Sequence, residues 1–176
     1  SFSQRSMKPI LRFLLSAAVA GVFVGVSVPA GLLLGVALLF VVPRMLDFLW
    51  SIDGKRAAWK GFAFAYLVGA VSFAIQLRWL TVVSPIGAVA LPLYLALFWG
   101  VFGAFASTLG NPFRDPSRFW NSAIGVTFAN AAVFAFLEWL RGWLFTGFGW
   151  NPLGVAFHKI SAVTQFADLV GVSGIS

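Results

Sequence analysis

Apolar residues in this chain form five long runs, and short polar or turn-rich segments separate them. The runs cover residues 10–28, 31–49, 61–80, 91–109 and 120–139. Each has roughly 20 residues, which as an α-helix rising about 1.5 Å per residue cross about 30 Å of hydrocarbon. The two-residue alternation that marks transmembrane strands does not occur in them. The pattern predicts an all-α, multi-pass transmembrane helical bundle with about five complete spans and the start of a sixth.

The segments between the runs predict how the helices are connected. Residues 29–31 are Pro-Ala-Gly and predict a tight reversal, because proline fixes φ and glycine permits positive φ. Residues 51–60 are polar and contain Asp-Gly, which is a turn signal. Residues 81–90 predict a short uncharged loop, and residues 111–118 predict a turn-rich loop bearing two arginines.

The amino-terminal run begins among three basic residues, Arg5, Lys8 and Arg12, as the apolar core of a signal peptide does. It is longer than the 7–15 residues of a typical signal core and leads directly into the second run, so we interpret it as the first span. We therefore expect a cytoplasmic amino-terminal segment at residues 1–9 and a transmembrane helical domain at 10–176. Met7 is an alternative start to Ser1, in which case the first six residues are an upstream extension.

Composition agrees with a membrane protein, because charged residues make up only 10% of the chain. A soluble domain carries about 25%. The net charge of +7 also tests the topology. With the amino terminus in the cytoplasm, most basic residues fall on the cytoplasmic side: Arg5, Lys8, Arg12, Arg44, Lys55, Arg56, Lys60, Arg114 and Arg118. Only Arg78, Arg141 and Lys159 fall outside, which is the asymmetry of the positive-inside rule. This places the 142–159 loop on the extracytoplasmic side.

Several chemistries have no residues to support them. The chain has no cysteine, which excludes a disulfide, a thiolate metal site and a thiol nucleophile within these residues. His158 is the only histidine, so there is no His-rich metal cluster. The basic residues of the 51–60 loop are explained by topology better than by nucleic-acid binding. We expect no metal, no cofactor and no nucleic-acid partner.

Residues 138–154 differ from the generic spans. Their sequence is E-W-L-R-G-W-L-F-T-G-F-G-W-N-P-L-G, with three tryptophans, four glycines and a proline. Glu138 and Arg141 are three residues apart and share a helical face, and a carboxylate near hydrocarbon is costly unless it is paired. Two interpretations remain open for this pair. It is either an interfacial ion pair that closes the helix or a support that fixes the geometry of the following loop.

The loop itself also has two interpretations. Gly147 and Gly149 allow backbone bends, while Phe148 and Trp150 present apolar surface at the level of the lipid headgroups. The tryptophan is either a member of the interfacial aromatic belt or part of a gate over a lipid-binding cleft.

This stretch, with Q-F-A-D-L-V-G-V-S-G at residues 165–174, resembles the apolipoprotein N-acyltransferases. That family has the pattern E-W-L-R, then T-G-F-P-W, then Q-x-A-D-x-x-G-x-x-G. The match covers the last third of the chain directly, and the layout of the earlier spans agrees with the family. Gly149 stands where the family commonly has proline, so we expect a more flexible loop here. We expect Asp168 and residues 171–174, just ahead of the expected sixth span, to form a polar entry loop and the start of a helix.

The resemblance implies an enzyme of the bacterial cytoplasmic (inner) membrane. Such enzymes transfer an acyl chain from a phospholipid to the amino group of the diacylglyceryl-cysteine of a lipoprotein precursor. Their chemistry belongs to an extracytoplasmic nitrilase-like domain with a Glu, a Lys and a nucleophilic Cys, which forms a thioester. We expect this chain to end before that domain, so no catalytic residue is expected in it.

The resemblance assigns roles to individual residues of the loop. The family tryptophan that is important for activity corresponds to Trp150. We expect Trp150, Phe148, Gly147 and Gly149 to contact the lipid substrate, with Glu138 and Arg141 as structural support: these form the predicted site.

Two other functions remain open. The chain is alternatively the membrane anchor of a polyprenol-phosphate glycosyltransferase, or a small transporter subunit. Against a transporter, the spans contain no run of ionisable residues of the kind that marks an ion or proton path.

Overall fold

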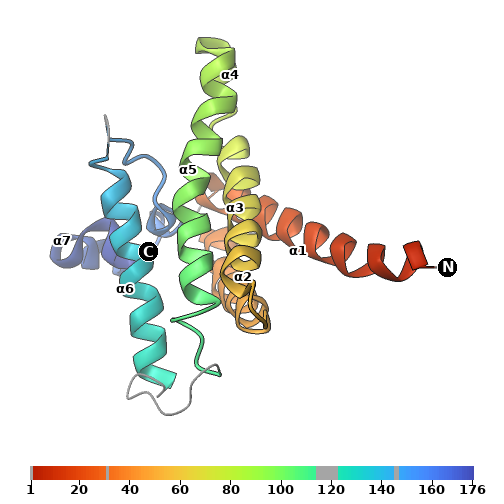
Figure 1. The fold of residues 1–176 in the computed structure, drawn as a ribbon. Helices are drawn as coiled ribbons and strands as arrows, with labels where there is room; N and C mark the ends of the chain where they lie inside the picture. The colour runs from red at the N-terminus through yellow and green to blue at the C-terminus, as the bar shows by residue number, and fades with distance from the viewer. Residues whose placement is uncertain (1, 31, 114–122, 145–146) are drawn as a thin grey trace.

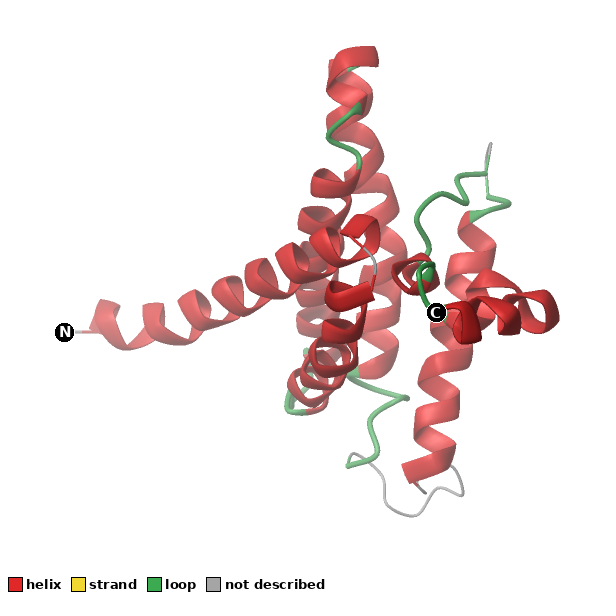
Figure 2. Cartoon of the chain, turned by 180° about the vertical axis from the view of Figure 1, so that it is seen from behind, coloured by secondary structure: helices red, strands yellow, loops and turns green. Residues whose placement is uncertain are grey.

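A computed structural model describes residues 2–30, 32–113, 123–144 and 147–176. The described part is helical, as predicted, and contains no strand (Figure 2). Its elements are α1 (Phe2–Ala30), α2 (Leu32–Trp50), α3 (Ala57–Gln76), α4 (Leu80–Val83), α5 (Pro85–Ala106), α6 (Ala123–Arg141), the 3₁₀-helix η2 (Leu153–Phe157) and α7 (Ser161–Ile175). The arginines of the predicted 111–118 loop, the start of the predicted fifth span at 120–122 and Thr146 lie outside the described residues.

Helices α3 and α5 lie side by side at the centre of the molecule (Figure 1). Glycine permits their close approach, because a Cβ at Gly61 would collide with the carbonyl oxygen of Gly103, and a Cβ at Gly103 with that of Gly61. The Ser107 hydroxyl donates a hydrogen bond to the Ala57 carbonyl at 3.1 Å. Small residues at a helix contact are typical of membrane bundles, where close backbone packing replaces hydrophobic burial as the driving force.

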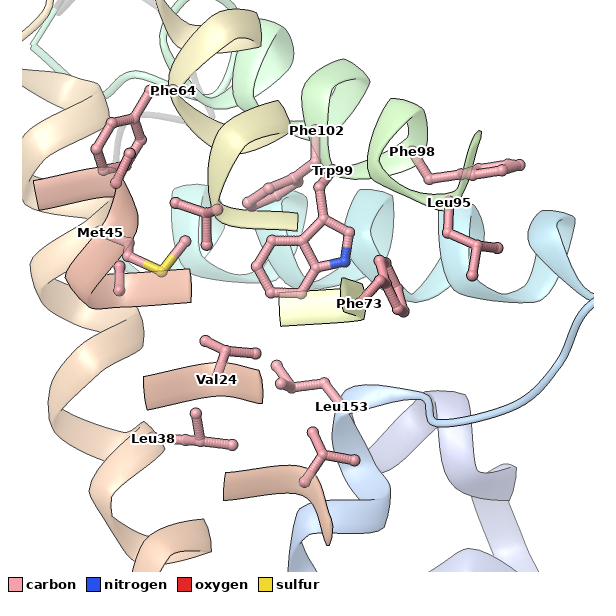
Figure 3. Packing of buried hydrophobic residues seen from close by; sticks show 14 of the residues in the cluster. Val24, Leu38, Met45, Phe64, Phe73, Leu95, Phe98, Trp99, Phe102 and Leu153 are labelled. Carbon is pink, nitrogen blue, oxygen red and sulfur yellow. The ribbon is translucent and has the colours of Figure 1, made fainter. Parts of the chain in front are cut away.

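Aromatic side chains connect the other helices to this pair. Phe13 of α1 and Phe48 of α2 both contact Phe64 of α3, with ring centroids 5.5 and 4.3 Å apart. Trp99 of α5 contacts Phe134 of α6 at 5.5 Å, edge to face. Figure 3 shows this buried cluster around Trp99. The amino-terminal part of α1 extends away from the bundle (Figure 1).

Among the described residues, three helical segments are long and apolar enough to cross a membrane: Pro9–Val28, Ala57–Gln76 and Pro85–Ala106. They correspond to the first, third and fourth predicted spans. Helices α2 and α6 cover much of the second and fifth predicted spans, and they are not among these three segments. The expected count of five complete spans is therefore not confirmed.

The predicted loop at residues 81–90 is wrong. Ser84 has an extended backbone, and its hydroxyl accepts a hydrogen bond from the Gly87 amide at 3.1 Å. Pro85 occupies the first helical turn, where its missing amide hydrogen costs nothing. Ser-Pro is thus an N-cap followed by a helix start, and α5 begins several residues before the predicted fourth span.

The predicted entry loop at Asp168 and residues 171–174 is also helical. It lies within α7, whose backbone leaves helical geometry at Gly171, with φ 69° and ψ 173°. Glycine adopts this conformation without the steric cost that a side chain would add. The segment is therefore a helix with a break rather than a loop followed by a helix.

Candidate functional site: the aromatic loop after α6

The loop from Gly147 to Pro152 joins the end of α6 to η2. Gly147 has φ +70°, and a Cβ at this position would collide with the carbonyl oxygen of Gly142. Asn151 also has a positive φ, of 50°. Gly149, by contrast, has open space where a Cβ would stand. The loop therefore needs glycine at its first bend, and it can accept a side chain at Gly149.

Glu138 lies near the end of α6 and is only 7% exposed. Its Oε1 accepts a hydrogen bond from the backbone amide of Leu153 at 2.8 Å. The Leu153 side chain packs in the same buried cluster as Val24 and Leu38 (Figure 3). Since a helix amide at this end has no partner inside the helix, the carboxylate satisfies it and fixes where η2 begins.

Arg141, one turn later on α6, is 1% exposed. Its Nη2 donates a hydrogen bond to the carbonyl oxygen of Trp150 at 3.2 Å. Its guanidinium carbon lies 5.3 Å from the centre of the Phe73 ring of α3, a cation–π geometry. Arg141 therefore connects three segments: the end of α6, the loop and the end of α3.

The interaction between Glu138 and Arg141 differs from a simple ion pair. Their opposite charges attract each other, but each side chain also interacts elsewhere: Glu138 with the Leu153 amide and the Ser176 side chain, and Arg141 with the Trp150 carbonyl. Glu138 Oε2 and Arg141 Nε have no hydrogen-bond partner among the described residues. Of the two interpretations left open by the sequence, this geometry favours support of the loop.

The side chain of Trp150 is 61% exposed and lies between two other aromatic rings. Phe148 of the same loop lies 6.3 Å away, centroid to centroid, with its plane inclined by 29°. Trp79, in the turn after α3, lies 5.8 Å away with an inclination of 34°. Spacing along the chain contains no signal for this contact between Trp79 and Trp150.

A pocket of about 460 Å³ lies between the end of α6, the loop and α7. Its lining includes both buried charged side chains and the exposed indole: Glu138, Arg141, Trp150, Pro152, Val155 and Ser173. Within the described residues there is no group of three or more His, Asp, Glu or Cys side chains that could hold a metal ion. The pocket thus brings the exposed Trp150 indole together with the two buried charged side chains of α6.

Comparison with known proteins identifies the family to which this site belongs. Residues 20–176 match the family model of the apolipoprotein N-acyltransferase N-terminal domain. The chain belongs to the apolipoprotein N-acyltransferase family. The resemblance first seen in residues 138–154 and 165–174 is therefore confirmed over most of the chain.

Curated relatives carry the same family name. The apolipoprotein N-acyltransferase of Rhizobium rhizogenes is 31% identical over 148 residues, covering 73% of this chain and 26% of that protein. That of Brucella suis is 32% identical over 155 residues, with 73% and 26% coverage. That of Rhodopseudomonas palustris is 32% identical over 151 residues, with 73% and 25% coverage. The chain thus spans about a quarter of the length of these relatives. No solved structure matches it.

The predicted site residues lie together in this region. Glu138, Arg141, Gly149 and Trp150 line the pocket, and Phe148 contacts the Trp150 ring. Gly147 forms the first bend of the loop. Their roles toward a substrate remain predictions.

Proposed function

We propose that this chain is the membrane domain of an enzyme that acylates lipoproteins. The enzyme would transfer an acyl chain from a phospholipid to the amino group of a diacylglyceryl-cysteine. Family membership and the long apolar helices support this proposal. The observation that carries it is the position of Trp150, whose backbone is held by Arg141 while its ring stays exposed at the rim of a pocket.

The reaction needs groups outside this chain. A cysteine thiolate of the catalytic domain would attack the ester carbonyl of the phospholipid, forming a thioester and releasing the lysophospholipid with a proton on its new hydroxyl. The lipoprotein amine would then attack the thioester, forming the amide and returning the thiol. A Glu and a Lys of that domain would serve the proton transfers.

The residues of this chain would bring the lipid substrates to that chemistry. Trp150 and Phe148 would contact acyl chains at the rim of the pocket, where their rings are partly exposed. Gly147 and Gly149 would let the loop move when a substrate enters. Glu138 would hold the start of η2 through the Leu153 amide, and Arg141 would hold the middle of the loop through the Trp150 carbonyl.

The topology proposed from the basic residues completes this arrangement. Residues 1–9 would lie in the cytoplasm, residues 10–176 would form the helical domain in the bacterial inner membrane, and the 142–159 loop would face the extracytoplasmic side. There the loop would meet both the phospholipid leaflet and the precursor lipoprotein.

Purified full-length gene product tests this function. In vesicles containing a phospholipid with a labelled acyl chain, we expect transfer of the label to a synthetic diacylglyceryl-cysteine peptide. A labelled acyl thioester on the protein should be trapped when the peptide is left out. Absence of both products, with ion or solute flux across the same vesicles, would favour the transporter alternative. Absence of all three would leave the anchor alternative.

A further inference from the structure

Trp79 lies in a turn that is itself firmly packed. The turn follows Gln76, the last residue of α3, and Leu77 within it is buried. The Leu77 amide donates to the Phe73 carbonyl at 2.8 Å, and the Leu80 amide donates to the Leu77 carbonyl at 2.8 Å. Trp79 therefore extends from a backbone that hydrogen bonds and a buried leucine hold to the end of α3.

Trp150 extends from a much less constrained backbone. Gly149 precedes it with open space around the Cβ position, and Asn151 follows it with a positive φ. Arg141 holds the carbonyl oxygen of Trp150, which fixes the position of the backbone but not the direction of the ring. The orientation of the indole needs a further contact.

Of the two rings beside Trp150, one belongs to the same loop and one does not. Phe148 packs against the buried cluster, and its amide donates a hydrogen bond to the Arg141 carbonyl at 3.0 Å, so it attaches the loop to α6 and the core. Trp79 belongs to the α3–α4 turn, and it is 46% exposed with its ring 5.8 Å from Trp150. Among the described aromatic contacts of Trp150, the one with Trp79 connects its ring to an element outside the loop, the turn after α3.

The end of α3 and the turn that follows it therefore make two contacts with the site, one to Arg141 and one to Trp150. Phe73 lies beneath the Arg141 guanidinium, and Trp79 lies beside the Trp150 indole. One contact supports the backbone of the loop, through Arg141, and the other supports the exposed ring. The two contacts come from residues less than two helical turns apart on the chain.

We propose that Trp79 is a positioning residue, which holds the Trp150 indole in the direction that receives acyl chains at the rim of the pocket. This inference rests on the proposed function. It gives Trp79 a role through Trp150, distinct from that of an interfacial tryptophan, which only anchors a helix end among the headgroups.

Kinetics of the full-length gene product test this role. In vesicles with increasing mole fraction of the acyl-donor phospholipid, Trp79→Ala should lower kcat/KM about three- to tenfold, which is the range expected for one lost aromatic pair. The effect should be mainly on KM for the phospholipid. Trp79→Phe should restore most of the activity because it keeps a ring against Trp150. Trp79→Leu, which keeps apolar bulk without a ring, should behave as the alanine variant does.

Trp59 provides the matched control. It lies at the opposite end of α3, is 73% exposed and contacts Phe62 but not the loop. If tryptophans at the ends of α3 act only as interfacial anchors, Trp59→Ala and Trp79→Ala should lower activity alike. We expect Trp59→Ala to leave kcat/KM unchanged. Equal losses in both variants would overturn the proposal.

A double-mutant cycle tests whether Trp79 acts through Trp150. If it does, the Trp79→Ala/Trp150→Ala protein should be no less active than Trp150→Ala alone, because the contact is already lost. Effects that multiply would mean that the two tryptophans act independently, and the proposal would be wrong.

Fluorine NMR gives a readout that does not depend on activity. In protein labelled with 5-fluorotryptophan, the Trp150 resonance is identified by its loss in Trp150→Phe. We expect this resonance to shift in Trp79→Ala and to stay in place in Trp59→Ala. An unmoved resonance would refute the positioning role. A shifted resonance combined with full acyl transfer by Trp150→Ala would instead refute the proposed function of the loop while leaving the Trp79–Trp150 contact in place.

Discussion

The Leu153 amide donates a buried hydrogen bond to Glu138 Oε1 at 2.8 Å, which connects the end of α6 to the first residue of η2. Leu153 in turn packs its side chain in the central apolar cluster. Leu153, which directly follows the exposed loop, is therefore fixed in two ways. The Glu138 carboxylate holds its amide, and the core of the bundle holds its side chain.

Replacing Glu138 tests this connection. Glu138→Ala leaves the buried Leu153 amide without a partner and should lower the free energy of unfolding by about 1–3 kcal/mol. Glu138→Gln keeps an oxygen that can accept the same hydrogen bond, so it should lose less. The measurement is thermal unfolding of the detergent-solubilised full-length protein. Equal losses in the two variants would show that the charge of Glu138, rather than this hydrogen bond, matters.

Lysine at position 141 should not hold the loop as Arg141 does. Lysine keeps the charge but lacks the planar fork that both reaches the Trp150 carbonyl and lies over the Phe73 ring. We expect chymotrypsin to cleave the loop several-fold faster in Arg141→Lys, because the loop backbone has lost its hydrogen bond. Arg78→Lys, an exposed arginine in the turn after α3, is the control. Unchanged cleavage in Arg141→Lys would contradict the role given to the guanidinium.

The two glycines of the loop should respond differently to alanine. At Gly147, the positive φ and the collision with the Gly142 carbonyl should cost about 1–2 kcal/mol or more. At Gly149, open space around the Cβ position predicts little change in stability. Unfolding midpoints of the two variants compare them directly. A larger loss for Gly149→Ala than for Gly147→Ala would contradict the described loop conformation.

Close packing of α3 against α5 makes a prediction remote from the loop. Gly61→Ala places a Cβ against the Gly103 carbonyl and the Ser107 hydroxyl, so it should force the helices apart at a cost of about 1–3 kcal/mol. Ala63→Val, at an exposed position of the same helix, should cost much less. Similar unfolding midpoints for both variants would mean that the two helices are less closely packed than described.

Sequence patterns predicted the helical class because long apolar runs have few other solutions in a membrane. They failed at residues 81–90, since Ser84 and Pro85 are read as loop residues although the same pair caps and begins a helix. For Glu138 and Arg141, the spacing showed a shared helical face. It did not show that both side chains bond to the returning loop, because the path of that loop is a tertiary feature.

The contact between Trp79 and Trp150 could not be predicted either. Trp79 lies at the end of the run at 61–80, whereas Trp150 lies in the loop after the run at 120–139, and no local period relates them. Their exposed rings follow the general preference of tryptophan for membrane interfaces, which by itself predicts no partner. The site residues within 138–150 were found because an unusual set of residue types occurs in one continuous stretch.

Acyl transfer by Trp150→Ala tests the central claim most directly. The full-length variant is compared with wild type and with Trp59→Ala in vesicles of the same phospholipid, at equal amounts of folded protein. We predict that Trp150→Ala transfers acyl chains to the diacylglyceryl peptide at least several-fold more slowly, whereas Trp59→Ala matches wild type. Wild-type rates in Trp150→Ala would contradict the claim that this loop presents the lipid substrate.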